Sequence, residues 1–210
     1  MIPVTVVESP SVPLLYADVD TDQIIPSRYI TSRTTEEFAR ALFAGRRADP
    51  GFALNRPEFA GRSILLAGRN FGCGSSREQA VWALLAGGFR AVVAPSFGDI
   101  FAGNAAQNGL LTARITPEEH AAVVRAVQAD PDVVLAVDLR ECEVSVRGTG
   151  VRARFDVDPF HRDLLLRGMD ELDYLLELAP RIEEYEASAA LHPVTAARIE
   201  RAAELTKERH

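Results

Sequence analysis

The chain has 210 residues, of which 47% are hydrophobic and 25% charged, and this composition is ordinary for a globular protein with a sizeable core. A net charge of −7 argues against nucleic acid binding, which depends on clustered Lys and Arg. No run approaches the roughly 18 consecutive apolar residues of a membrane span, and residues 1–12 lack the basic and apolar regions of a signal peptide. We therefore expect a cytoplasmic protein whose partners are neither nucleic acid nor membrane.

The first part of the chain predicts irregular structure around one helix. Residues 18–26 (DVDTDQIIP) place three acids beside an apolar pair, which indicates a loop leading into a short strand. Residues 34–43 are typical of a helix. Residues 46–62, with two prolines and two glycines, predict a long irregular connection, and loops of that length are uncommon unless they are functional or flexible.

The middle of the chain alternates strands and helices. Residues 63–67, 91–94 and 110–113 are short apolar runs typical of buried strands, and residues 76–85 and 99–106 between them favour helices. This order predicts parallel strand pairing with right-handed crossovers.

The last third predicts a small β portion and several helices. Thr116, Pro117 and Glu119 form a capping box with proline at the first helical position, so a helix should run from there to about Ala129. Strands are expected at residues 133–137, 142–146 and 151–157, with a hairpin turn at 148–150. Further helices are expected at 159–167, 182–190 and 194–209.

The turn between the first buried strand and its helix carries the chemistry. Helix N-termini bind anions through free backbone N–H groups and partial positive charge. Gly72 and Gly74 let the main chain approach a ligand closely, and Arg77 adds a guanidinium suited to a carboxylate. Ser75 and Ser76 supply hydroxyls at the same place, so we predict a carboxylate-binding loop that presents a serine.

The local pattern alone leaves other interpretations open. Ser75 or Ser76 can simply cap the helix. A serine hydrolase would require a G-x-S-x-G motif and a partner histidine; none of the four histidines has an obvious triad context, and even for His161, the least implausible, the sequence favours a structural role. The segment matches neither common phosphate-binding glycine motif. Two cysteines far apart, Cys73 and Cys142, fit neither a disulfide framework nor a C-x-x-C metal site.

Several motifs in order resemble one family. Residues 70–78 (NFGCGSSRE), 94–101 (APSFGDIF) with Asn104, and 108–111 (NGLL) resemble the small subunits of 3-isopropylmalate dehydratase, which are similar to the swivelling C-terminal domain of aconitase. Residues 18–26 resemble the same family's N-terminal signature, and residues 158–160, 168–170 and 184–186 its C-terminal part. The resemblance covers roughly residues 12–187.

The resemblance implies an α/β fold, a swivelling β/β/α domain like the C-terminal domain of aconitase. It would form a single domain over residues 1–190, with a substrate-loop insertion around 27–62 and a C-terminal helical extension at 191–210. The family implies a hydro-lyase that interconverts 2-isopropylmalate and 3-isopropylmalate in leucine biosynthesis. A larger partner chain would carry a 4Fe–4S cluster on three cysteines, and this chain would bind no cofactor itself.

The resemblance also assigns residues. Ser75 would be the base that removes the proton next to a carboxylate. Ser76 and Arg77 would bind the carboxylate of a small di- or tricarboxylate substrate, and Asp22 and Gly74 would be substrate-binding residues of the same site. Arg28 can be a second carboxylate contact or a solvated arginine, and Cys73 can simply be a small residue in a tight turn.

Some positions depart from the family pattern. Gln79 stands where histidine is common, and Val81 where proline is frequent. Residues 33–38 lack a glycine often found there, and residues 42–47 lack the aromatic of a Trp-Arg pair. Because these residues lie near the loop expected to shape substrate choice, homoaconitate or a methylated malate stay open as substrates, as does a non-catalytic carboxylate-binding module.

Overall fold

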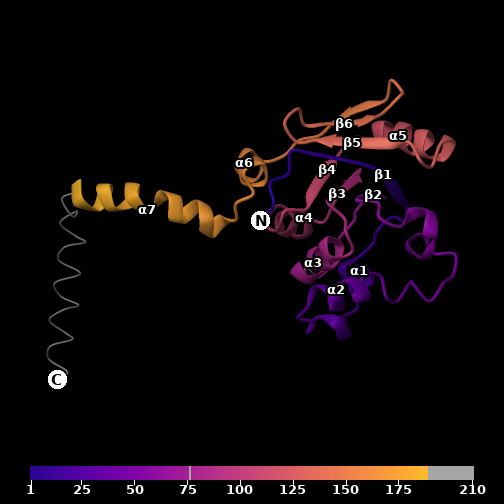
Figure 1. The fold of residues 1–210 in the computed structure, drawn as a ribbon, viewed down its shortest axis with the longest axis horizontal. Helices are drawn as coiled ribbons and strands as arrows, with labels where there is room; N and C mark the ends of the chain where they lie inside the picture. Colours follow the sequence, from indigo (N-terminus) through magenta and orange to yellow (C-terminus); the bar gives the residue numbers. More distant parts are fainter. Residues whose placement is uncertain (76, 189–210) are drawn as a thin grey trace. The chain divides into compact units, whose positions relative to one another are not determined.

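A computed structural model describes residues 1–75 and 77–188 of the chain (Figure 1). The chain divides into two compact units, Met1–Asp170 and a second unit that begins at Glu171. This division falls before the expected boundary near residue 190, and the extension expected at 191–210 lies outside the described residues. The described part of the second unit is one helix, α7 (Glu171–Ser188). In the part of the chain that the structure describes, no helix is both long and apolar enough to cross a membrane.

Seven strands form one sheet in the order β4-β3-β2-β1-β5-β6-β7. The strands are β1 (Val6–Leu14), β2 (Ile64–Ala67), β3 (Ala91–Ala94), β4 (Leu111–Arg114), β5 (Val134–Asp138), β6 (Glu143–Val146) and β7 (Arg152–Arg154). Strands β1 to β4 are paired in parallel, and β5, β6 and β7 continue from β1 in antiparallel pairing. The expected parallel pairing of the three middle strands is confirmed.

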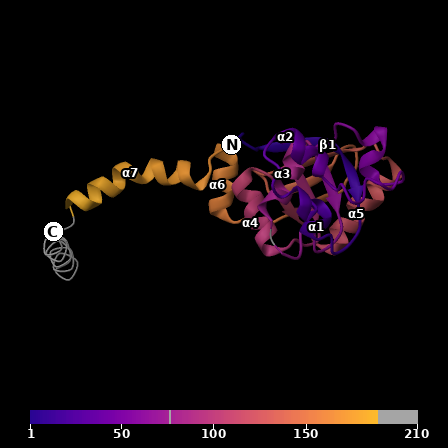
Figure 2. The ribbon, with the colours of Figure 1, turned by 90° about the horizontal axis from the view of Figure 1, so that it is seen from below.

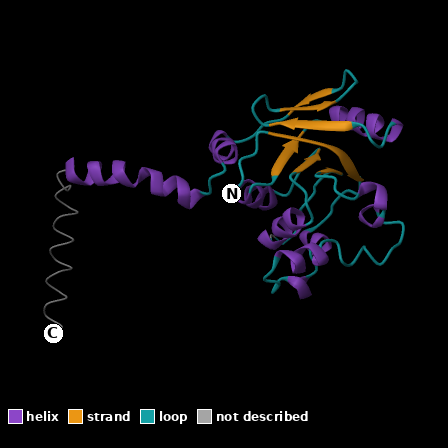
Figure 3. Cartoon of the chain, viewed as in Figure 1, coloured by secondary structure: helices purple, strands orange, loops and turns teal. Residues whose placement is uncertain are grey.

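Strand β1 belongs to both halves of the sheet (Figure 3). Residues 11–14 pair in parallel with β2, whereas residues 6–10 pair antiparallel with β5. Proline cannot donate a backbone hydrogen bond, so it is rare in central strands. Here Pro10 is the last residue paired with β5, where the strand changes from one neighbour to the other, and Pro13 lies within the short stretch paired with β2.

The first unit has three layers. The helices α1 (Thr21–Ile24), α2 (Thr35–Ala41), α3 (Glu78–Ala86) and α4 (Asp99–Asn108) cover one face of the parallel strands, and Figure 2 shows α1, α3 and α4 together on the near side. The antiparallel strands, with α5 (Pro117–Ala129) and α6 (Pro159–Arg167), cover the other face. This is the expected β/β/α arrangement.

Each parallel strand contributes to two hydrophobic cores because its side chains alternate between faces. In β2, Leu65 and Ala67 belong to the core beneath the helices, and Ile64 and Leu66 to the core shared with the antiparallel strands. All four residues are fully buried. The continuous apolar runs in the sequence therefore reflect burial on both faces.

The expectation of a loop and strand at residues 18–26 is wrong at its centre. The segment forms the short helix α1, with Asp20 as its N-cap: the backbone N–H of Gln23 donates to Asp20 Oδ1 over 2.7 Å. Asp at an N-cap satisfies a free N–H group of the first turn. The acids that suggested a loop therefore include the residue that starts a helix.

The long connection at 46–62 is ordered by buried aromatic side chains. It contains two short 3-10 helices, Ala53–Asn55 and Pro57–Phe59, and it buries Phe52 and Phe59. Phe52 packs on Phe43 with ring centroids 5.6 Å apart. These side chains anchor the connection to the core beneath the helices.

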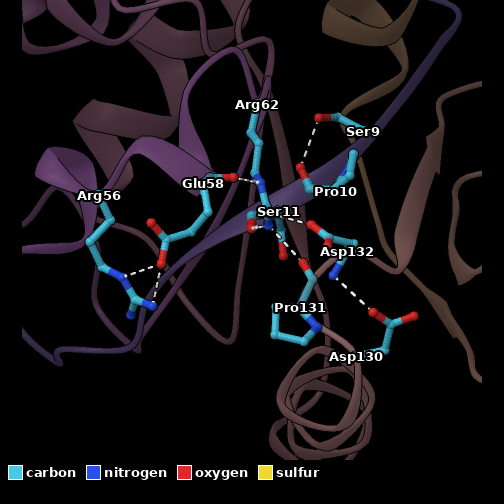
Figure 4. Close-up of polar contacts among 9 residues, drawn as sticks. All are labelled: Ser9, Pro10, Ser11, Arg56, Glu58, Arg62, Asp130, Pro131 and Asp132. Atoms are coloured by element: carbon cyan, nitrogen blue, oxygen red, sulfur yellow. Dashed lines mark hydrogen bonds and ion pairs between the residues drawn. The ribbon is translucent and has the colours of Figure 1, made fainter.

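Arg62 fastens the end of this connection to two other segments (Figure 4). Its side chain is only 6% exposed and donates to the carbonyls of Glu58 (3.1 Å), Ser11 (2.9 Å) and Pro131 (2.7 Å). Its Nη2 also pairs with Asp132 Oδ1 at 2.7 Å. One buried guanidinium thus joins the connection, strand β1 and the segment after α5.

His120 on α5 gives the fold a dependence on pH. Its Nε2 lies 2.8 Å from the carbonyl oxygen of Ala67, the last residue of β2, and burial lowers the pKa of His120 below its ordinary value near 6.5. The unfolded chain therefore takes up this proton first as pH falls, so the free energy of unfolding should decrease below about pH 6.5. Urea unfolding at pH 7.5 and 5.5 measures this decrease, which we expect to be smaller in His120→Gln.

His161→Gln, on α6, is the matched histidine control and should keep the decrease seen in the wild type. Acidic groups contribute equally to all three proteins, so only the difference between them reports on His120. An equal decrease in His120→Gln and wild type would contradict this assignment.

Candidate active site

Three segments meet at the carboxyl ends of β1, β2 and β3. The segment after β2 is bridged to the segment after β1 at Cys73 and Asp20, and to the segment after β3 at Phe71 and Phe97. The N–H of Gly72 donates to the Val19 carbonyl at 2.8 Å. Ligands of open α/β sheets bind outside the carboxyl ends of the strands, so this junction is where a site is expected.

Glycine is required at two positions of this junction. Gly72 has φ +74°, and a side chain there would overlap the Phe101 ring. A Cβ on Gly98 would lie 2.5 Å from the Gly72 carbonyl oxygen. The close approach of the two turns therefore depends on both glycines.

Ser75 lies outside the helix that follows it. Helix α3 begins at Glu78, later than the expected start at residue 76, and its N-cap is Arg77, whose side chain makes no capping bond. Ser75 is exposed, and no partner for its hydroxyl is found among the described residues. A simple capping role for Ser75 is therefore wrong, and Ser76 lies outside the described residues.

Two adjacent residues of helix α1, Thr21 and Asp22, hold the turn between β2 and α3 that carries Ser75, called the serine turn below. Thr21 donates from Oγ1 to the Ser75 carbonyl oxygen at 2.5 Å and from its backbone N–H to the Cys73 carbonyl at 3.0 Å. Asp22 Oδ1 forms an ion pair with Nη1 of Arg77. The Arg77 side chain is 17% exposed and that of Asp22 is 54% exposed, so the arginine is half enclosed while its partner reaches solvent. The structure thus brings the predicted residues Asp22, Gly74, Ser75 and Arg77 together.

Cys73 behaves as a packing residue in this environment. Burial raises the pKa of the Cys73 thiol, and the neighbouring carboxylates of Asp20 and Asp18 raise it further. The thiol is therefore neutral near pH 7, and a neutral thiol is a poor nucleophile and metal ligand. This agrees with a small residue that fills a tight turn.

Other residues considered from the sequence lie in different surroundings. Arg28 is exposed, and its guanidinium stacks over the Tyr29 ring at 4.8 Å. His161 Nδ1 lies 3.8 Å from Asp158 Oδ1 on α6. In residues 1–75 and 77–188, neither His161 nor His120 contacts Ser75, so these two histidines do not form a serine hydrolase triad with it; His192 and His210 lie outside the described residues.

A polar network at the first turn of α3 was not predicted from the sequence. The amide of Asn108 donates to Glu78 Oε1 at 2.9 Å, and the Trp82 indole donates to Asn108 Oδ1 at 2.9 Å. Asn108 was visible only as part of a motif and as the end of a helix. Its contact with Glu78 joins residues 30 positions apart, and no local pattern signals it.

The chain has fewer cysteines than the iron–sulfur cluster implied by the resemblance requires. Such clusters are held by cysteine thiolates, and three are needed in the site that the resemblance implies. The sequence has only Cys73 and Cys142, the first in the serine turn and the second beside β6. Among the described residues, no group of three or more His, Cys, Asp or Glu side chains is placed to hold a metal ion.

Fold and site together define a class. The aconitase C-terminal domain family matches residues 10–118, which include residues 10–14 of β1, the strands β2 to β4 and the serine turn. The crystal structure of 3-isopropylmalate dehydratase from Methanocaldococcus jannaschii superimposes with a TM-score of 0.65 at 28% identity, over 85% of this chain and 98% of that one. The chain is therefore a swivelling domain of the aconitase type.

Similar curated proteins indicate which family within this class the chain belongs to. A 3-isopropylmalate dehydratase small subunit from Rubrobacter xylanophilus is 47% identical, over 90% of this chain and 95% of its own length. That of Frankia casuarinae is 50% identical over 89% and 95%, and that of a Roseiflexus species 45% over 94% and 100%. This chain belongs to the family of 3-isopropylmalate dehydratase small subunits.

Proposed function

We propose that this protein is the small subunit of a heteromeric hydro-lyase that interconverts 2-isopropylmalate and 3-isopropylmalate in leucine biosynthesis. One observation carries the proposal: in a chain of this family, an exposed serine and a half-enclosed arginine share one turn at the carboxyl ends of parallel strands. The arginine supplies a charge for a carboxylate, and the serine supplies an oxygen beside it. A cytoplasmic location remains a prediction from the sequence.

Ser75 is the proposed base. As an alkoxide, its Oγ takes the proton from the carbon next to a substrate carboxylate, and the C–H electron pair becomes the new double bond as the hydroxyl leaves the neighbouring carbon. In the reverse direction Ser75 returns the proton to one carbon of the double bond while hydroxide adds to the other, with the two positions exchanged. The proton and hydroxide together make up one water, and the serine alkoxide is regenerated. General base catalysis of this kind contributes about 10²–10⁴-fold.

A serine alkoxide needs stabilisation by positive groups. The free N–H groups at the start of α3 and the guanidinium of Arg77 provide it from within this chain. Charge interactions are much stronger away from water. Since Ser75 is exposed here, the proposed large subunit has a second task, which is to cover the turn and exclude water.

Arg77 and Ser76 are the proposed carboxylate contacts, and Asp22 has an indirect role. A guanidinium has five N–H donors, and the pair with Asp22 uses Nη1, so donors remain for the substrate. A carboxylate at Asp22 would repel a dicarboxylate that approached it directly. We therefore assign Asp22 to orienting Arg77.

The 4Fe–4S cluster is assigned to the large subunit, because this chain lacks the three cysteines. When bound there, the cluster supplies a Lewis acid that assists loss of the hydroxyl. Homoaconitate or a methylated malate is the alternative substrate. Residues 33–47, which depart from the family pattern, are the reason to keep that alternative. Arg46 in this segment donates to Gln23 of α1 at 2.5 Å and so connects the segment to the helix that holds the site.

Anaerobic co-expression with a candidate large subunit tests the proposal. We expect the two chains to copurify and to hydrate 2-isopropylmaleate. Copurification with turnover of homoaconitate or a methylated malate alone would replace the substrate and keep the architecture. Copurification with no hydration of any of these acids would favour the non-catalytic module. Failure to associate with any cluster-bearing chain would contradict both the partner and the function.

A further inference from the structure

We infer that Thr21 is a positioning residue for Ser75, through the hydrogen bond from its hydroxyl to the Ser75 backbone carbonyl. The inference rests on the proposed function, in which Ser75 is the base. Thr21 is distant from Ser75 in sequence and carries no chemistry of its own in the proposed reaction. Its role follows from the two backbone carbonyl groups that its N–H and its hydroxyl bind.

Thr21 grips the serine turn on both sides of Gly74. Its N–H binds the Cys73 carbonyl at 3.0 Å and its Oγ1 binds the Ser75 carbonyl at 2.5 Å. Gly74, between these carbonyls, has φ +84° and is exposed. Because glycine is the most permissive residue of the backbone, the peptide after Gly74 needs an external anchor to keep one orientation. Thr21 Oγ1 is that anchor.

Thr21 is itself held rigidly. It is 1% exposed, and it begins α1, whose first turn is fixed by the bond from the Gln23 N–H to Asp20 Oδ1. The N–H of Ile25 donates to the Thr21 carbonyl at 2.9 Å. Thr21 is thus buried, and both its backbone N–H and its backbone carbonyl are hydrogen-bonded, so it can hold the exposed turn in a fixed position.

The Ser75 side chain depends on this anchor. Its hydroxyl has no partner in the part of the chain that the structure describes, so the direction of its Cα–Cβ bond is set by the backbone alone. A misplacement of about 1 Å at a reacting group can cost about 10²-fold in rate. Arg77 is held separately, by Asp22, so loss of the Thr21 hydroxyl should misplace the base while the carboxylate contact persists.

The experiment compares Thr21→Val, which removes the hydroxyl at nearly constant shape, with Thr21→Ser, which keeps it. Both are assayed in the anaerobic complex with the large subunit on 3-isopropylmalate. We expect kcat to fall about 10–100-fold in Thr21→Val, KM to change less than about threefold, and Thr21→Ser to stay within about threefold of wild type. Thr21→Ala replaces Thr21→Val if the valine variant does not fold.

Two results would overturn the inference. The first is a wild-type kcat in Thr21→Val, and the second is an equal loss in Thr21→Ser, which would assign the effect to the methyl group. Amide hydrogen exchange of the isolated subunit gives a readout without catalysis: residues 73–77 should exchange faster in Thr21→Val than in Thr21→Ser. If wild type has no activity on 3-isopropylmalate, the proposed function fails, while the exchange result still decides whether Thr21 holds the turn.

Discussion

Replacing Ser75 with alanine should lower kcat of the complex on 3-isopropylmalate by about 10²–10⁴-fold, which is the usual contribution of a general base. The variant removes the one oxygen that accepts the proton and leaves Arg77 paired with Asp22. KM should therefore change little. Steady-state kinetics of the copurified complex measure both constants.

The same substitution should leave the fold and the association of subunits intact. Ser75 is exposed, and its contact with Thr21 uses the backbone carbonyl, which alanine retains. Ser145→Ala, on β6 in the antiparallel layer, is the matched control and should keep wild-type kcat. Normal turnover by Ser75→Ala would remove Ser75 from the role of base, whereas loss of copurification would point to a structural role.

Replacing Arg62 with leucine should lower the free energy of unfolding by about 2–4 kcal/mol. The guanidinium serves three backbone carbonyls and Asp132, and a buried carbonyl left without a donor costs about 1–3 kcal/mol. Asp132 is 84% exposed, so water replaces the lost ion pair there at little cost. Urea unfolding of the isolated subunit measures the change.

Arg56→Leu provides a close control for Arg62→Leu. Both guanidinium groups stack on Phe59, at 4.9 Å for Arg56 and 4.6 Å for Arg62. The Arg56 side chain is 52% exposed, however, and its partner Glu58 is 47% exposed. Exposed pairs of this kind contribute at most about 1 kcal/mol. Equal losses in the two variants would show that stacking on Phe59, and not the buried hydrogen bonds, stabilises this connection.

Much of the first unit could be predicted because its signals are local. Continuous apolar runs predicted the buried parallel strands, and the capping box at Thr116 gave the start of α5 at Pro117. The box is present in the structure, where Thr116 Oγ1 accepts from the Glu119 N–H at 3.2 Å. Helix α6 also has the expected bounds, Pro159–Arg167.

Features that depend on long-range contacts could not be predicted. Strand β1 contains two prolines and was not recognised as the centre of the sheet, because its place is set by partners far along the chain. Helix α7 begins at Glu171, earlier than the expected residue 182, and it continues through Pro180. Proline normally interrupts a helix, so the helical turns that precede Pro180 were not predicted.

The candidate site also has features that could be predicted from the sequence and contacts that could not. Glycines, serines and an arginine on one turn could be recognised from their chemistry and from a family resemblance. The bond from Thr21 to Ser75 spans 54 positions, and the pair of Asp22 with Arg77 spans 55. The pairing of β1 with β2 and the bridge between Asp20 and Cys73 bring these segments together, so no pattern within either segment could indicate the contacts.

The double pairing of β1 has a consequence for how the protein is made. The strand is made before every other strand of the sheet, yet residues 6–10 find their neighbour only when β5 is synthesised. During that interval the parallel half can assemble around residues 11–14, while the other half of the same strand stays without its partner strand. An unpaired strand edge favours association with other chains, so nascent chains that stop before residue 134 should be the aggregation-prone species during synthesis.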